Sequence, residues 1–377
     1  MQFRDLVRQY NVLKNQIDKA LIDTAASGGY IMGKAVKELE TELASYVGVK
    51  RCISCANGTE ALTLSLKALG VKSGDAVFVP DFTFFASSEV ISLEGATPVF
   101  VDVCEDTYNL DAKSLEENIK AVIDKGELRP KAIIAVDLFG LPADYLKIRK
   151  IADKYGLYIV EDAAQGFGGV INGQKACSFG DIGATSFFPA KPLGCYGDGG
   201  AVFTDNEEFA TLIESYRVHG KGSFKYDNVR IGINSRLDTL QAAVLQVKFK
   251  AFKDYELTDI NKAAMAYTER LHDIVKTPII PDGFLSSWAQ YTIRLKNRQQ
   301  RDALQTFLKS EGVPSMVYYP KPMHLQTAYA FLNYAESTNP VTINLCDTVL
   351  SLPIHPYITV DEIDTVSKLI RKFISQE

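Results

Sequence analysis

Cysteine and histidine are scarce in this sequence, and their scarcity excludes two kinds of protein. The 377 residues include only six cysteines and four histidines. A disulfide scaffold or a large metal site would need more of them, at closer spacing. Cys52 and Cys55 have the C-x-x-C spacing, but their small and apolar neighbours predict a buried strand, and no second pair follows at metal-ligand spacing. We expect free thiols, no metal and a reducing, cytoplasmic location.

Long apolar runs and an excess of positive charge are also missing. No segment approaches the ~18 apolar residues that a membrane span needs. Residues 1–8 mix both charge signs and have no apolar core of a signal peptide. Lysine and arginine total 41 against 46 aspartates and glutamates, a formal net charge of −5 without a basic block. We therefore expect neither a membrane nor a nucleic acid as a partner.

Short apolar runs alternate with helical patterns over the first two-thirds of the chain. Each run has the length of a buried strand, and a helical pattern at 59–70 follows the first. Such alternation predicts a mostly parallel sheet covered by helices on both faces, with ligands beyond the carboxyl ends of the strands. The strand-like runs are 47–55, 76–80, 98–102, 132–137 and 157–162.

After about residue 235 the pattern changes to that of a smaller α+β unit. We expect Ser235 to cap a helix that runs to about Val247. At roughly 150 residues per domain, the length suggests a large domain at 1–250 and a small one at 251–377. The expected elements of the small domain are a strand at 291–295, a helix at 298–309, a strand at 315–319 and a helix at 361–374.

Three segments carry the reactive chemistry. Lys191 precedes a glycine-rich turn, a pattern that also suits a hairpin with a solvated lysine. Asp162 ends an apolar run, where a turn or cap role is the ordinary alternative. Gly58 and Thr59 begin a helix, whose free amide groups and dipole favour a phosphate, although Thr59 could simply be the N-cap. A lysine, an acid and an anion site are together the parts of a pyridoxal phosphate enzyme.

In order and spacing, these segments resemble the DegT/DnrJ/StrS-type nucleotide-sugar aminotransferases, which are fold-type I pyridoxal phosphate enzymes. The resemblance implies an α/β fold with a mixed, mostly parallel central sheet, a smaller α+β C-terminal domain and a homodimer with shared active sites. One departure is Ala190, which stands where the family often has a small hydroxyl residue. The other segments that carry the resemblance are 27–33, 95–102, 232–243 and 352–356.

The resemblance also assigns the residues that hold the cofactor, pyridoxal 5'-phosphate. Lys191 corresponds to the lysine that bonds it covalently, and Asp162 to the acid at its ring nitrogen. The resemblance assigns six more residues to the cofactor, although each of them, considered singly, could simply serve packing, a turn or a helix start. In the family, their counterparts contact the phenolic oxygen (Gln165), stack on the ring (Phe84), bind the phosphate (Gly58, Thr59, Ser186) or reach the phosphate from the other subunit (Asn234).

Five further residues are candidate substrate contacts. His219, Tyr318 and His324 lie in segments that resemble the substrate side of the family. Packing is the simpler explanation of Tyr30. Arg236 is the candidate for a sugar carboxylate, and the alternative is an ion pair with Asp238.

The resemblance implies transfer of an amino group from an amino acid, expected to be glutamate, to a nucleotide-linked keto sugar. The pathway would be the synthesis of cell-surface polysaccharide, such as lipopolysaccharide, or of another glycan. A UDP-2-acetamido-3-keto uronic acid is favoured, and a 4-keto-6-deoxy sugar is the alternative. A pyridoxal phosphate-dependent dehydratase is disfavoured because histidine replaces the lysine in that branch. A non-catalytic cofactor-binding regulator lacks support, since no DNA-binding extension occurs.

Overall fold

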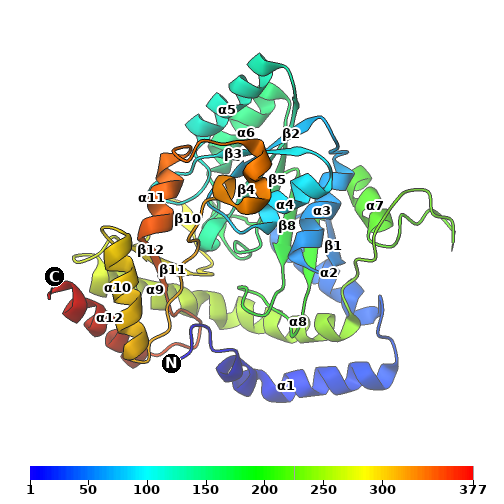
Figure 1. The fold of residues 1–377 in the computed structure, drawn as a ribbon. Coiled ribbons are helices and arrows are strands. Elements are labelled where there is room, and N and C mark those ends of the chain that lie inside the picture. The colour runs from blue at the N-terminus through cyan, green and yellow to red at the C-terminus, as the bar shows by residue number, and fades with distance from the viewer. Residues whose placement is uncertain (225, 377) are drawn as a thin grey trace.

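A central sheet with helices on both faces adjoins a smaller α+β unit in the computed structural model, which describes residues 1–224 and 226–376 (Figure 1). The described strands of this sheet run in the order β1-β9-β8-β5-β4-β2-β3. β9 is antiparallel to β1 and β8, and the remaining pairs are parallel. The strands are β1 (Arg51–Cys55), β2 (Asp75–Pro80), β3 (Thr97–Val101), β4 (Arg129–Val136), β5 (Tyr158–Asp162), β8 (Ile182–Ser186) and β9 (Gly200–Thr204).

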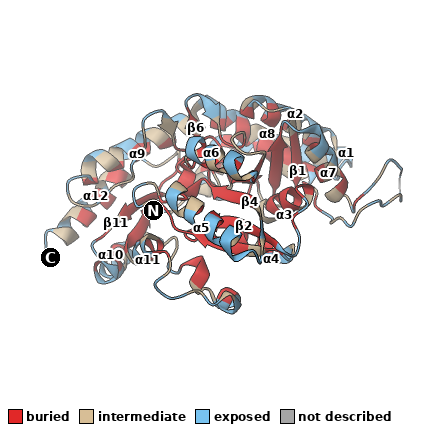
Figure 2. Cartoon of the chain, turned by 90° about the horizontal axis from the view of Figure 1, so that it is seen from above, coloured by how far each residue is buried: buried red, intermediate tan, exposed pale blue. Residues whose placement is uncertain are grey.

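Both faces of the sheet are covered, and this explains the uninterrupted apolar runs in the sequence. In β2, Val77 and Val79 pack in one core cluster, whereas Ala76 and Phe78 pack in another. Successive side chains of a strand point to opposite faces, so a strand buried on both faces must be apolar throughout. The strands are accordingly buried between flanking helices (Figure 2). The expected α/β architecture with a mixed, mostly parallel sheet is confirmed.

Helices pack on each face of the sheet. α3, α4 and α7 share a core with one face, and α5 and α6 share a core with the other. Within the described residues, no helix is long and apolar enough to cross a membrane. The helices of this part are α1 (Leu6–Ser27), α2 (Lys34–Val47), α3 (Gly58–Ala68), α4 (Ala86–Leu93), α5 (Ala112–Lys125), α6 (Tyr145–Tyr155), α7 (Glu207–Tyr216) and α8 (Thr239–Ala251).

The C-terminal part has a hydrophobic core of its own, formed by residues 260–370. A π-helical turn, Phe252–Glu256, joins α8 to its first helix. The expected division at residue 250 falls at the end of α8 and stays a prediction. Its main elements are α9 (Leu257–Leu271), β11 (Tyr291–Arg294), α10 (Arg298–Ser310), α11 (Pro340–Thr348), β12 (Val349–Leu352) and α12 (Val360–Ile374), with β11 antiparallel to β12.

Two expected features are wrong. Ser235 does not cap α8, which begins at Thr239 after Asp238. The Ser235 hydroxyl instead accepts a hydrogen bond of 3.2 Å from the Ala56 N–H, beside the start of α3. Residues 315–319 do not form a regular strand, because only Met316 pairs with β12, through an isolated bridge to Ser351, before the segment turns toward the large sheet.

Candidate active site

Lys191 lies in the loop that connects β8 to β9. Its main-chain N–H donates to the Phe188 carbonyl at 2.9 Å. Burial lowers the pKa of Lys191, an effect that the nearby carboxylate of Asp162 opposes. The segment is a hairpin, as the simpler interpretation held, but its lysine is half-buried rather than fully solvated. A lysine with a lowered pKa is more often neutral, and the neutral amine is the nucleophile.

Asp162 is the last residue of β5, at the carboxyl end of the parallel strands. Its Oδ2 accepts a hydrogen bond of 2.7 Å from the Ser87 hydroxyl, and its Oδ1 accepts one of 3.1 Å from the Ala164 N–H. Burial raises the pKa of Asp162, and these two donors and Lys191 oppose the increase. Sequence reasoning missed Ser87, which lies in the first turn of α4 and contacts Thr83 at 3.0 Å.

The first turn of α3 forms a cradle against Ser186. Asn57, rather than Thr59, is the N-cap: its side chain accepts from the Glu60 N–H at 2.8 Å. A Cβ on Gly58 would lie only 2.6 Å from the Ser186 Cβ, so glycine alone allows this approach. The first N–H groups of a helix have no intrahelical acceptor and are available to an anion. Gly58 and Ser186 therefore meet at the N-terminus of α3, and their roles and that of Thr59 as phosphate contacts stay predictions.

Gln165 is fixed by hydrogen bonds at both ends of its side-chain amide. Its Oε1 accepts from the Phe139 N–H at 2.8 Å, and its Nε2 donates to the Tyr319 hydroxyl at 3.1 Å. Tyr319, which the sequence did not single out, also has its ring 6.3 Å from that of Phe84. Phe84 is 55% exposed. An aromatic ring that is this exposed beside a polar cluster is available for stacking, because it does not pack in the hydrophobic core.

Asn234 and His219 lie on adjacent, exposed stretches of chain. Val218 and Asn234 form an isolated bridge, and the His219 N–H donates to the Ile233 carbonyl at 2.8 Å. Tyr318, by contrast, is half-buried and packs edge-on against Phe3 at 6.1 Å.

Tyr30 and Arg236 border the start of α8. The Tyr30 carbonyl accepts from the Thr239 N–H at 2.9 Å, and its hydroxyl donates to the Ala25 carbonyl at 3.0 Å. The side chain of Arg236 has no hydrogen-bond or ion-pair partner within residues 1–224 and 226–376, so the ion pair with Asp238 is not formed there. Arg236 is half-buried and available to a ligand.

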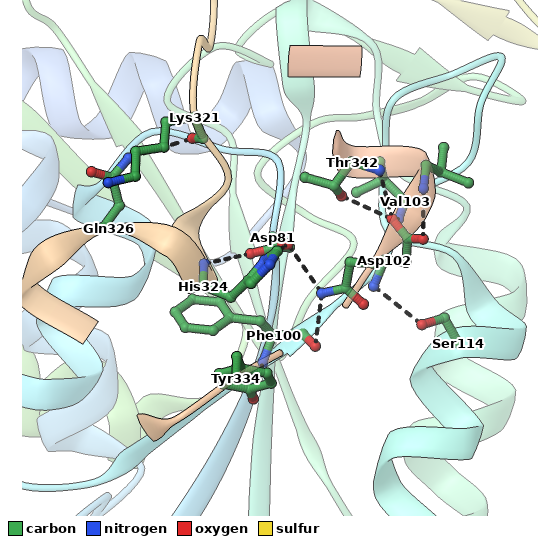
Figure 3. A network of polar contacts seen from close by, with 12 residues as sticks. Asp81, Phe100, Asp102, Val103, Ser114, Lys321, His324, Gln326, Tyr334 and Thr342 are labelled. Carbon is green, nitrogen blue, oxygen red and sulfur yellow. Dashed lines mark hydrogen bonds and ion pairs between the residues drawn. The ribbon is translucent and has the colours of Figure 1, made fainter. Parts of the chain in front are cut away.

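His324 is buried in a polar network that ties the C-terminal part to the large sheet (Figure 3). The ring Nδ1 of His324 lies 2.5 Å from Asp81 Oδ2, and the main-chain N–H of His324 donates to Asp81 Oδ1 at 2.7 Å. Asn339 donates to the same Oδ2 at 3.1 Å, and Thr342 donates to Asp102 at 2.8 Å. His324 thus faces Asp81, and its role as a substrate contact stays a prediction.

The residues around Lys191 fit pyridoxal phosphate. Gly58 packs directly against Ser186 at the start of α3, where the first helical N–H groups offer the kind of donors that a phosphate needs. Asp162 supplies a buried carboxylate for the ring nitrogen, and Phe84 an open aromatic face. These features come from β5, β8, α3 and the turn before α4, which meet at one edge of the sheet.

Comparisons with known proteins agree with this geometry. Residues 11–371 match the DegT/DnrJ/EryC1/StrS aminotransferase family. The chain is 45% identical to the UDP-2-acetamido-2-deoxy-3-oxo-D-glucuronate aminotransferase of Pseudomonas aeruginosa, over 95% of this chain and 96% of that protein. A DegT DnrJ EryC1 StrS aminotransferase from Brucella abortus matches with a TM-score of 0.96 and 50% identity over 99% of both chains.

A third match bears on the cofactor. NtdA from Bacillus subtilis, solved with bound cofactor PMP, has a TM-score of 0.91 and 29% identity over 100% of this chain and 85% of that one. These matches confirm the resemblance inferred from the lysine, acid and phosphate segments. This chain belongs to the DegT/DnrJ/EryC1/StrS aminotransferase family.

Proposed function

We propose that this chain is a pyridoxal phosphate-dependent aminotransferase that moves an amino group from glutamate to a UDP-linked 2-acetamido-3-keto uronic acid. The observation that carries the proposal is the placement of Lys191 near Asp162: a half-buried amine whose pKa is lowered by burial lies within the electrostatic influence of a buried carboxylate. The identity to the Pseudomonas aeruginosa enzyme, named for a 3-oxo-glucuronate, supports the choice of sugar.

The chain's own residues then have distinct tasks. Pyridoxal phosphate, when bound, supplies an electron-withdrawing ring that stabilises negative charge at the carbon that loses its proton. Asp162, held by Ser87 and Ala164, offers the ring nitrogen a carboxylate that need not reorient. Neutral Lys191 accepts a proton at Nζ and returns it to another atom. Such general acid–base transfer typically contributes about 10²–10⁴-fold to the rate.

We infer that two copies of the chain share their active sites in a cytoplasmic homodimer. Asn234, which corresponds to the phosphate contact from the other subunit, is exposed. The segment that precedes it carries exposed apolar side chains: Phe224 is 73% and Ile231 90% exposed. Apolar side chains clustered on a surface are typical of a protein–protein contact. A second copy would cover them and bring Asn234 to the partner's cradle.

Arg236 supports a substrate that carries a carboxylate. Its guanidinium has no partner in the described residues and follows Asn234 by two positions. Guanidinium groups bind carboxylates and phosphates through two parallel hydrogen bonds. A uronate adds a carboxylate to the diphosphate of the nucleotide, so Arg236 suits this sugar class. The product would be an amino sugar for cell-surface polysaccharide.

The deciding experiment loads the protein with pyridoxal phosphate and glutamate, then screens UDP- and dTDP-linked keto sugars by mass spectrometry. We expect amination of the 3-keto uronate, and none by the Lys191→Ala variant. Amination of a 4-keto-6-deoxy sugar alone would replace the proposed substrate. A dehydrated product would indicate a dehydratase, and bound cofactor without turnover of any sugar would indicate a regulator.

The carboxylate role of Arg236 has its own readout. In Arg236→Ala, amination of the uronate should fall far more than the half-reaction with glutamate, because only the sugar carries the extra carboxylate. Lys221→Ala, another cation of the same exposed segment, serves as the matched control. Equal loss in both half-reactions would contradict the assignment.

A further inference from the structure

The N-terminal arm, residues 1–5, is fixed by contacts with the C-terminal part of the chain. The Phe3 carbonyl accepts from the Ile354 N–H at 3.2 Å. At the start of α1, Arg8 donates to the Tyr357 carbonyl at 2.7 Å and binds Glu362 through two hydrogen bonds of 2.9 Å. The arm therefore has a defined course although it precedes the first helix.

Arg4 extends from this arm to the loop that carries Lys191. Its Nη2 donates a hydrogen bond of 3.0 Å to the carbonyl oxygen of Lys191 itself, across 187 positions in the sequence. Its Nη1 is buried and has no hydrogen-bond partner within the described residues. A cavity of about 10 Å³, the size of one water molecule, adjoins the guanidinium and is lined by Arg4, Gln9, Pro189, Lys191 and His355.

Arg4 supplies a positive charge next to the Lys191 peptide. Burial lowers the pKa of Arg4 to about 10, and Glu256 opposes the decrease, so the guanidinium stays charged at neutral pH. His355 is neutral there, because burial, together with Arg4 and Arg8, lowers its pKa to about 4.

The charges around Lys191 act in opposite directions. Burial is the largest influence and lowers the pKa of Lys191. Asp162 raises that pKa, whereas Arg4 lowers it. The site needs the carboxylate of Asp162 for the ring nitrogen, but a carboxylate also favours a proton on a neighbouring lysine. A fixed cation beside the lysine offsets that tendency.

We propose that Arg4 is a positioning residue for Lys191: it fixes the carbonyl of the lysine's own peptide and keeps a positive charge near that lysine. The inference rests on the proposed role of Lys191 as the cofactor lysine. In this role Arg4 acts through Lys191. Removal of its charge should therefore leave Lys191 in place but more often protonated.

The test measures the protonation of Lys191 directly, in protein without cofactor. Lysines are labelled with trace acetic anhydride over a pH series, and peptide mass spectrometry gives the extent of labelling at Lys191. In Arg4→Met, which removes the charge and the donor, the neutral fraction of Lys191 at pH 7 should fall by roughly twofold or more, because a nearby cation disfavours the protonated amine. Arg4→Lys, which keeps the charge, should retain most of the wild-type titration.

Arg8→Met is the matched control, because it loosens the same arm without removing the charge next to Lys191. Its Lys191 titration should equal that of the wild type. An unchanged titration in Arg4→Met, or an equal change in Arg8→Met, would overturn the proposal. If Arg4→Met does not fold, Arg4→Gln, an uncharged side chain with amide donors, decides by the same criterion. Borohydride mapping identifies the cofactor lysine separately, so failure here leaves that assignment intact.

Discussion

Ser87 donates a hydrogen bond to Asp162 across 75 positions in the sequence. The serine lies in the first turn of α4 and the aspartate at the end of β5, so the bond joins two elements that flank the site. The Ala164 N–H donates to the other oxygen, so both carboxylate oxygens of Asp162 accept a hydrogen bond. Ser87 is also the strongest influence that opposes the increase of the Asp162 pKa through burial.

Ser87→Ala should reduce activity and change its pH dependence. A hydrogen bond to a charged group contributes about 1.5–3 kcal/mol, so kcat/KM should fall roughly 10–100-fold. The pKa of Asp162 should increase, so the acid limb of the kcat/KM profile should move to higher pH. Ser65→Ala is the control, because that buried hydroxyl donates only within its own helix. A loss of activity without movement of the acid limb would contradict this role.

Lys191, rather than the buried Lys248, should carry the cofactor. Burial also lowers the pKa of Lys248, to about 8, so a lowered pKa alone does not distinguish the two lysines. The Lys248 ammonium lies 5.2 Å from the Tyr196 ring, whereas Lys191 lies within the electrostatic influence of the Asp162 carboxylate. Borohydride reduction of the loaded protein and peptide mapping should find the label on Lys191. Label on Lys248, or none despite visible cofactor, would refute the assignment.

Gly58→Ala should weaken cofactor binding through the cradle. The new methyl group would lie 2.6 Å from the Ser186 Cβ, and overpacking of this kind typically costs about 1–3 kcal/mol. We expect a roughly 5–150-fold weaker affinity for pyridoxal phosphate, measured by absorbance titration. Adding Ser186→Gly removes the clash and should restore part of the stability of the protein without cofactor. Additive losses in the double variant would show that the two residues do not meet.

Mixed dimers test the shared active site. Lys191→Ala and Asn234→Ala should each be nearly inactive, whereas subunit exchange between them should restore activity. The reason is that a mixed dimer contains one site in which both residues are intact. Rescue is measured as activity after mixing, and mixed Lys191→Ala and Asp162→Asn proteins, two changes within one chain's own site, serve as the control. Activity of a dilute monomer would contradict sharing.

Asp137 should make stability depend on pH. Burial raises the pKa of Asp137 well above its ordinary value, and Glu161 raises it further. A carboxyl group with a raised folded-state pKa stabilises the fold fully below its unfolded-state pKa, about 3.9, and loses this contribution as pH increases through the folded-state value. Asp137→Asn, which is always neutral, should therefore stay close to the wild type below about pH 4 and gain relative stability as pH increases above that value.

Denaturant unfolding of the cofactor-free protein over a pH series measures this difference. Asp81→Asn is the control for loss of a buried carboxylate. Because it disrupts the contact with His324, it should cost about 1–3 kcal/mol at neutral pH. Parallel pH dependence in the wild type and Asp137→Asn would disprove the role of Asp137.

Local patterns predicted much of the fold, whereas the roles of the reactive residues came from the resemblance of several ordered segments to a known family. The apolar run that ends at Asp162 predicted both β5 and an acid at its carboxyl end. Glycine and threonine at the start of a helical pattern predicted the beginning of α3. Each of these signals depends on residues a few positions apart, so no knowledge of distant contacts was needed.

Contacts between distant residues could not be predicted in this way. Ser87, Tyr319 and Arg4 reach partners 75, 154 and 187 positions away, and only the order of the strands and the course of the arm bring them together. The prediction that Ser235 caps α8 was wrong for the same reason. A hydroxyl before a helical pattern is typical of an N-cap, but this one is engaged by Ala56, which is 179 positions away.

The arm also has a practical consequence for how the protein is produced. Because Phe3 and Arg4 contact the C-terminal part and the Lys191 loop, an affinity tag fused directly before Met1 would lie next to the contacts that hold the arm. α12 ends at Ile374, after its packed face, and offers a freer attachment point. Recombinant protein is therefore better tagged at its C-terminal end, or released from an N-terminal tag before any assay.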